Sequence, residues 1–250
     1  MTPPASLTNK VALVTGAARR IGAAIATTLH RHGASVVVHY RGSGSEAAAL
    51  AAGLNAERSD SALAIRADLL DTRGHAGLIR SVLDWHGRLD VLVNNASSFY
   101  ATPPGTIGED DWDELVGANL KAPLFLSQAA MQPLAAHGGA IVNIVDIHAA
   151  RPLRNHAVYG AAKAGLAMLT RALAKDLGPD IRVNGVAPGA ILWPENGMDE
   201  ATKTAIVDQI PLARVGDPDD VAGCVLYLVR DAAYVTGQII AVDGGRSIGW

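Results

Sequence analysis

Cysteine is nearly absent from the sequence, since Cys224 is the only one among 250 residues. A single cysteine excludes an intrachain disulfide and fits a reducing compartment. Cys224 lies in the apolar stretch "DDVAGCVLYLV", which favours a small core residue over a nucleophile. The first ten residues, "MTPPASLTNK", lack the apolar core of a signal peptide. Together these features predict a soluble, cytoplasmic protein.

Long apolar runs and long basic runs are missing as well. No apolar stretch reaches the roughly 20 residues needed to cross a bilayer, and the net charge is −3. We therefore expect neither a membrane nor a nucleic acid as partner. The eight histidines are scattered, without metal-ligand spacing to a carboxylate, so no metal is expected.

Short β-branched runs alternate with longer alanine-rich helical patterns along the whole chain. Nearly continuous apolar character in the short runs is typical of parallel strands buried on both faces. The predicted strands are 11–15, 35–40, 62–68, 89–95, 139–145, 181–188 and 237–245, and the predicted helices are 20–32, 44–58, 71–86, 109–136, 155–178 and 217–230.

This alternation predicts an α/β fold: one domain over residues 1–250, built on a Rossmann-type, doubly wound parallel sheet of seven strands with helices on both faces. Residues 189–216 follow the least regular pattern. We expect them to form a loop with short helices that serves as a lid over the site.

Ligands of such a fold bind beyond the carboxyl ends of the strands, where the strand order reverses. The first strand ends in "VTGAARRIG", in which Gly16 ends the strand and Gly22 opens the helix. Small Ala17 and Ala18 let the backbone approach a pyrophosphate, and the helix N-terminus offers free N–H groups. A tight turn without a ligand is the alternative, because the strict G-x-G-x-x-G pattern is absent.

An acidic residue is missing after the second strand, where NAD sites usually place one for the adenosine ribose. The segment "VVVHYRGSGSE" has none before Glu46. Arg41, together with Arg19 or Arg20, is suited instead to a 2′-phosphate. The sequence therefore predicts NADPH as the cofactor, in a site that also includes His39, Tyr40 and Ser43.

The third and fourth strands end in further candidate residues. Asp68 is placed to accept a hydrogen bond from the adenine amino group, or else to cap the helix that starts near Asp71. "NNASSFY" closes the fourth strand, and Asn94, Asn95 and Ala96 are expected beneath the cofactor.

Taken in order, the motifs resemble those of the short-chain dehydrogenase/reductases over essentially the whole chain. They are "TGAARRIG", "NNA", Asn119 in "GANL", the pair Tyr159 and Lys163, and Pro188–Gly189. Finer features are similar to the pteridine reductase branch: Arg20 in place of the middle glycine, "HYRGS", "NNASSFYATP", and Asp146 where a serine is usual.

The resemblance implies a catalytic set of Asp146, Tyr159, Lys163 and Asn119. Asn119 would support a water in a proton path, and a helix kink or cap is its alternative role. The cofactor site would further include Ile21, Leu69, Ser97, Tyr159, Lys163, Pro188 and Gly189.

An aspartate at position 146 makes chemical sense for a pterin. A protonated carboxyl can hydrogen-bond to a basic ring nitrogen and relay a proton towards it. We expect the nearby Lys163 cation to lower the pKa of Tyr159 and make its phenol a better acid.

The predicted substrate-binding residues are Arg20, Ser97, Phe99, Asp146, Tyr159 and Trp193. Phe99 offers a face on which a pterin can stack, with core packing as the alternative. Trp193 is expected to line the lid, or to pack against a neighbouring subunit. His148 and His156 are given no role, because histidines on loops are usually just solvated.

These residues predict an NADPH-dependent reductase of pterins, acting on dihydropterin or dihydrofolate and also on oxidised forms. Two rivals stay open: a ketone or 3-oxoacyl reductase of the same family, and a non-catalytic cofactor-binding sensor. The family resemblance implies a homotetramer. The tail "DGGRSIGW" departs from the pattern of tails that reach a partner's site, since Arg246 lies near the last strand and Trp250 is terminal.

Overall fold

Seven short apolar segments form one parallel sheet in a computed structural model that describes residues 6–193 and 197–248. The strand order is β3-β2-β1-β4-β5-β6-β7. The strands are β1 (Val11–Val14), β2 (Ser35–Tyr40), β3 (Ala62–Arg66), β4 (Val91–Asn94), β5 (Ala140–Ile144), β6 (Arg182–Pro188) and β7 (Ile239–Val242). The central strands β1, β4 and β5 are buried throughout, which explains why they alternate so little between apolar and polar residues.

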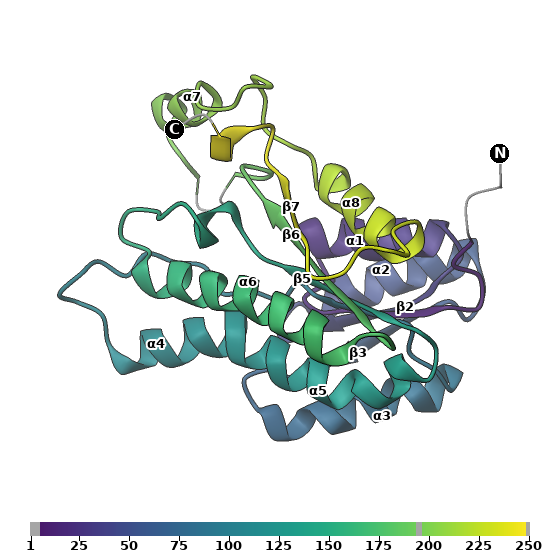
Figure 1. Cartoon of the computed structure of the whole chain (residues 1–250). Helices are drawn as coiled ribbons and strands as arrows, with labels where there is room; N and C mark the ends of the chain where they lie inside the picture. The colour runs from purple at the N-terminus through teal and green to yellow at the C-terminus, as the bar shows by residue number, and fades with distance from the viewer. Residues whose placement is uncertain (1–5, 194–196, 249–250) are drawn as a thin grey trace.

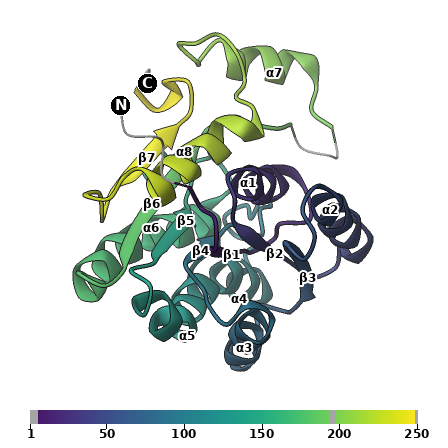
Figure 2. The same ribbon diagram turned by 90° about the vertical axis from the view of Figure 1, so that its right-hand side faces the viewer.

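Helices cover both faces of this sheet (Figure 2). One layer holds α1 (Arg20–Arg31), α2 (Gly44–Glu57) and α8 (Pro218–Arg230), and the other holds α3 (His75–His86), α4 (Glu109–Val116), α5 (Ala122–Ala135) and α6 (Ala157–Leu177). Two buried apolar clusters, one on each side, join the layers to the sheet. The predicted doubly wound α/β fold is therefore confirmed.

A short helix, α7 (Glu200–Val207), stands apart from both layers (Figure 1). It belongs to the segment 189–216 predicted as a lid, of which residues 194–196 lie outside the described residues, as does Trp250. In the described ranges 6–193 and 197–248, no helix has the length and hydropathy that a membrane span requires.

The predicted helix 109–136 is wrong in one respect, because it is two helices joined by a π-helical segment, Gly117–Lys121. The amide of Ala122 bonds to the carbonyl of Gly117, five residues earlier. Asn119 is the physical reason, since its side-chain amide donates to Leu115 O at 2.9 Å and takes up a carbonyl of the preceding turn.

Strand order reverses between β1 and β4, which lie side by side in the sheet although β2 and β3 intervene in the chain. The chain continues from these two strands to helices on opposite faces of the sheet, which leaves a crevice at the carboxyl edge. The fold therefore places a ligand site at Gly16–Arg20 and at the residues after Asn94.

Candidate active site

A cleft of about 520 Å³ opens at this crevice. It is lined by residues that follow β1, β2, β3 and β4. Those predicted for the cofactor are Gly16, Arg19, Arg20, Ile21, His39, Tyr40, Arg41, Ser43, Asp68, Leu69, Asn95, Ala96 and Ser97. Ala18 and Gly22, expected at the pyrophosphate, line it too, and so do four residues that were not predicted from the sequence: Gly42, Leu70, Ser98 and Ala118. Their position next to predicted residues was the available signal.

The loop after β1 passes close to the loop after β4. Gly16 has a φ of 60°, and a Cβ on it would lie 3.0 Å from Cα of Ala96. Thr15 Oγ1 accepts from the amides of Asn95 and Ala96, each at 2.9 Å. Asn95 Nδ2 in turn donates to Thr15 O at 2.8 Å. These bonds hold the two strand ends together, and the role of Thr15 was missed in the sequence.

His39 braces the floor of the cleft in its neutral form. Its Nδ1 accepts from the amide of Gly16 at 3.1 Å, so Nε2 carries the proton and donates to Ala67 O at 3.1 Å. Burial lowers the pKa of His39 to about 4. His39 therefore ties the ends of three strands together without adding charge to the cleft.

The adenosine end of the cleft is rich in guanidinium groups. Arg19 and Arg41 are exposed there, and no acidic residue follows β2 before Glu46. Asp68 is the only carboxyl group that lines the described cleft. Its Oδ1 accepts from the amide of Leu70 at 3.0 Å, so Asp68 does not cap the next helical turn.

Asp71 performs that cap instead, accepting from the amide of Arg73 at 3.2 Å. The capping interpretation of Asp68 is therefore wrong.

Arg20 connects the cofactor loop to the predicted lid. Its φ of 55° is a left-handed conformation, which explains why glycine is usual at this position. Its guanidinium donates to Trp193 O at 3.3 and 3.4 Å. The structure thus brings together two residues that were predicted for the substrate from opposite parts of the chain.

Asp146, Tyr159 and Lys163 converge at the carboxyl end of β5, and none of the three is among the residues that line this cleft. Asp146 follows β5 in an extended conformation, and the other two lie on buried positions of α6. The Tyr159 hydroxyl donates to Asp146 Oδ2 at 2.7 Å, and the other carboxyl oxygen accepts from the amide of His148 at 2.8 Å. Lys163 Nζ donates to Ile144 O at 2.8 Å and lies 5.8 Å from the centre of the Tyr159 ring.

Burial, more than the lysine, governs the proton affinity of the phenol. The pKa of Tyr159 is raised well above its ordinary value by burial and then by the adjacent Asp146 carboxylate. The expectation that Lys163 lowers this pKa is therefore wrong. The ammonium group is itself fully buried, and burial lowers the pKa of Lys163 to about 8 although Asp146 opposes the shift.

Asn119 is fully buried and uses both ends of its amide. Nδ2 donates to Ser98 O at 2.8 Å as well as to Leu115 O, and Oδ1 accepts from the Ser97 hydroxyl at 2.6 Å. It lies in the π-helical kink and holds the loop after β4. Its support of a water near Lys163 stays a prediction.

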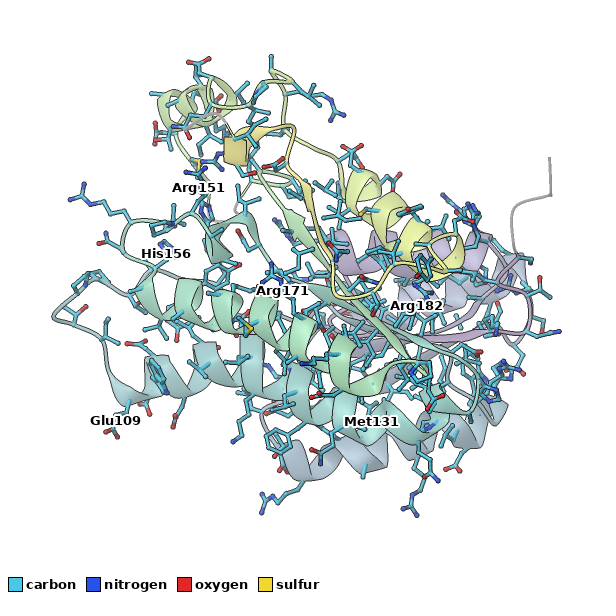
Figure 3. The ribbon with its side chains drawn as sticks, viewed as in Figure 1. Glu109, Met131, Arg151, His156, Arg171 and Arg182 are labelled. Carbon is cyan, nitrogen blue, oxygen red and sulfur yellow. The ribbon has the colours of Figure 1, made fainter. Side chains whose placement is uncertain are left out.

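Phe99 lies just past β4 with 52% of its surface exposed, so it is not a core residue. Its ring and the Tyr159 ring form a T-shaped contact, with ring centres 4.8 Å apart and planes at 78°. One of its faces stacks on His156 at 4.8 Å and 18°. His156, shown at the start of α6 in Figure 3, was given no role from the sequence. Only its place three residues before Tyr159 could have pointed to it.

Pro188 and Gly189 do not line the cleft described above. Gly189 donates its amide to Val242 O at 3.0 Å, and a Cβ there would lie 2.6 Å from Cβ of Asp243. Packing against β7 thus explains the glycine, and a contact of these two residues with the cofactor stays a prediction.

The cleft suits a dinucleotide that carries a 2′-phosphate. Backbone at Gly16 and Gly42 borders it, and a Cβ on Gly42 would meet nothing within 4 Å, so the chain is open to a ligand there. Arg19 and Arg41 supply positive charge where a phosphate would lie. Such a cleft, together with a buried tyrosine and lysine and a half-buried carboxyl group, defines an NAD(P)-dependent oxidoreductase.

Comparison of the sequence with known proteins identifies the family of the chain. A sequence profile described as enoyl-(acyl carrier protein) reductase matches residues 16–247. The chain belongs to the short-chain dehydrogenase/reductase family, as its motifs predicted.

The alignments with its relatives span almost the full length of this chain and of each relative. Pteridine reductase 1 of Leishmania tarentolae is 38% identical over 97% of this chain and 98% of its own. A 3-oxoacyl-[acyl-carrier-protein] reductase of Staphylococcus aureus is 39% identical over 95% and 98%. A solved blue fluorescent protein from a metagenomic library, in complex with NADPH, has a TM-score of 0.89 at 37% identity, covering 96% of this chain and 99% of its own.

Proposed function

We propose that this protein is an NADPH-dependent pterin reductase, which converts dihydropterins or dihydrofolate to their tetrahydro forms and also accepts oxidised pterins. The observation that carries the proposal is the 2.7 Å hydrogen bond between Tyr159 and Asp146. A serine hydroxyl at position 146 would suit a carbonyl oxygen. A carboxyl group can hold a proton for a basic ring nitrogen. The identity of 38% to a pteridine reductase supports this choice.

NADPH is the cofactor, and when bound it supplies a hydride to a ring carbon of the substrate. The residues that would hold its 2′-phosphate are Arg19, Arg41 and Ser43. The amides at the start of α1 would face the pyrophosphate, Asp68 the adenine, and Lys163 the nicotinamide ribose. The absence of an acidic residue after β2 and the NADPH complex of a solved relative support this assignment.

Asp146 and Tyr159 deliver the proton. Because burial raises the pKa of Tyr159, the phenol keeps its proton at neutral pH until a base comes within reach. The carboxyl group holds that hydroxyl in place and passes the proton to a ring nitrogen. Lys163, with a pKa of about 8, is largely cationic at neutral pH and offsets the negative charge left on the pair. Asn119 supports the path by which the proton is replaced.

Phe99 orients the substrate. A pterin is flat and stacks on an exposed aromatic face, which fixes its plane while Arg20, Ser97 and Trp193 border its edge. Holding the ring beside Asp146 and Tyr159 removes much of the entropic barrier to proton transfer. Closure of residues 189–216 over the ring is part of this proposal, and the contact between Arg20 and Trp193 O supports it.

A ketone or 3-oxoacyl reductase is the second candidate. The identity of 39% to the staphylococcal 3-oxoacyl reductase favours it. In that case Asp146 has replaced serine without a change of substrate, and Asp146→Ser should increase turnover of a β-ketoester. If the protein reduces pterins, the same variant should lose dihydropterin turnover.

The deciding experiment follows NADPH oxidation with dihydrobiopterin, dihydrofolate, biopterin and a simple β-ketoester side by side. Asp146→Asn tests the carboxyl group, and Asp180→Asn, at an exposed position, is the matched control. We expect turnover of dihydrobiopterin that Asp146→Asn abolishes and Asp180→Asn leaves unchanged. Turnover of the β-ketoester alone would select the second candidate. No turnover with any substrate would favour a cofactor-binding sensor.

The proposed assembly is a homotetramer. Large apolar side chains are exposed on α5 and α6, where Phe125, Met131 and Met168 have 38%, 37% and 63% of their surface accessible. Covering such side chains favours association of copies of the chain. Light scattering of the purified protein should give four times the mass of the chain, and a monomer mass would contradict the assembly.

A further inference from the structure

The loop after β4 and the loop before α6 are joined by their backbones. Thr102 donates its amide to Asn155 O, and Thr102 pairs with His156 in an isolated β-bridge. Thr102 is 2% exposed, so this junction is shielded from water. The loop that carries Phe99 is also held at Ser98, whose carbonyl accepts from Asn119 and whose hydroxyl donates to Glu114.

His156 is fixed within this junction. Its Nδ1 lies 2.7 Å from Arg154 O and therefore carries the proton in that contact. This bond sets the plane of the imidazole, which lies nearly parallel to the Phe99 ring at 4.8 Å. The stacked pair is thus supported from both loops.

Phe99 consequently has one covered face and one open face. His156 occupies the first, and 52% of Phe99 remains exposed although the Tyr159 ring also meets it in a T-shaped contact at 78°. A flat ligand can add to the stack only on the side away from His156. The imidazole would then back the Phe99 ring on the face opposite the ligand.

We propose that His156 is a positioning residue for a flat heteroaromatic substrate: its imidazole braces Phe99, so that the opposite face of Phe99 is presented to the ring. This inference rests on the proposed function, since only a flat substrate profits from the stack. Figure 3 shows His156 on the same side of the molecule as Arg151, and its stack on Phe99 links it to the proposed substrate site.

The test compares five variants of the full chain with dihydrobiopterin and saturating NADPH. His156→Ala removes the stacking ring, and His156→Phe keeps a flat ring without the bond to Arg154. His137→Ala, at an exposed position after α5, is the control. Phe99→Leu, with and without His156→Ala, asks whether the histidine acts through Phe99.

We expect His156→Ala to raise KM by about three- to tenfold, the usual effect of losing one aromatic contact, with kcat within about twofold. His156→Phe should restore KM, and His156→Ala should add nothing in the Phe99→Leu background. The dissociation constant of biopterin, measured by its fluorescence with the NADP⁺-loaded protein, should follow KM.

Three results would overturn the inference: an unchanged KM for His156→Ala, a His156→Phe variant no better than His156→Ala, or a full effect of His156→Ala without Phe99. If the wild-type protein neither reduces dihydrobiopterin nor binds biopterin, the proposed function fails and this inference fails with it. Turnover that is indifferent to His156 contradicts the positioning role alone.

Discussion

Replacing Lys163 with methionine should make the stability of the cofactor-free protein respond differently to pH. The ammonium group is fully buried, and its pKa falls from an ordinary 10.5 to about 8 because burial disfavours the charge. That difference corresponds to roughly 3 kcal/mol of destabilisation while the group is charged in both the folded and the unfolded chain. The bond from Lys163 to Ile144 O offsets part of this cost, so a comparison at one pH is not decisive.

The pH dependence isolates the charge. Between the folded pKa of about 8 and the unfolded value of 10.5, the unfolded chain binds more protons than the folded one. The free energy of unfolding of the wild type therefore rises with pH in this window, and the cost is fully present below it. Relative to Lys163→Met, the wild type should gain about 2.5 kcal/mol between about pH 7 and about pH 10.

Urea unfolding at both pH values, at one protein concentration, measures this change. Lys175→Met, which removes an exposed lysine from the same helix, is the control. Its difference from the wild type in the free energy of unfolding should be the same at both pH values. If the free energies of unfolding of the wild type and Lys163→Met differ by the same amount at both pH values, the argument that the ammonium group is desolvated is refuted.

Three further predictions concern the reaction, the cofactor and the fold. Tyr159→Phe should lower kcat with dihydrobiopterin by about 10²–10⁴-fold. The dissociation constant of NADPH, measured by fluorescence titration, should stay unchanged. A variant that keeps wild-type turnover would show that the phenol is not part of the mechanism. Arg41→Ala should raise KM for NADPH by about 10- to 100-fold through loss of a charge-assisted hydrogen bond and should change KM for NADH little. An equal increase in KM for both cofactors would contradict recognition of the 2′-phosphate. Asp90→Ala should lower the free energy of unfolding in urea by about 2–3 kcal/mol, because the buried carboxylate accepts from the amide of Val11 at 2.9 Å and pairs with Arg88. The KM values of this variant should match those of the wild type. A loss of less than about 0.5 kcal/mol would show that the ion pair contributes little to stability.

The sequence by itself determined the fold class, the family and most of the cofactor cleft. Apolar runs such as "VALVT" and the small residues after them are local features, and parallel strands bring the ends of such runs to one edge of the sheet. The pair Tyr159 and Lys163 is also local, since residues four apart share a helix face. The glycine and arginine residues after the first two strands could therefore be predicted to line one cleft.

Only the tertiary structure decided how distant loops meet and how deeply each group is buried. The contact of Phe99 with His156 and the bonds from Thr15 to the loop after β4 join residues far apart in the chain. Burial also reversed the expected shift in the pKa of Tyr159, because desolvation and the adjacent Asp146 carboxylate both raise it. Strand order and loop packing set these distances and solvent exposures, and neither is a property of any short stretch of sequence.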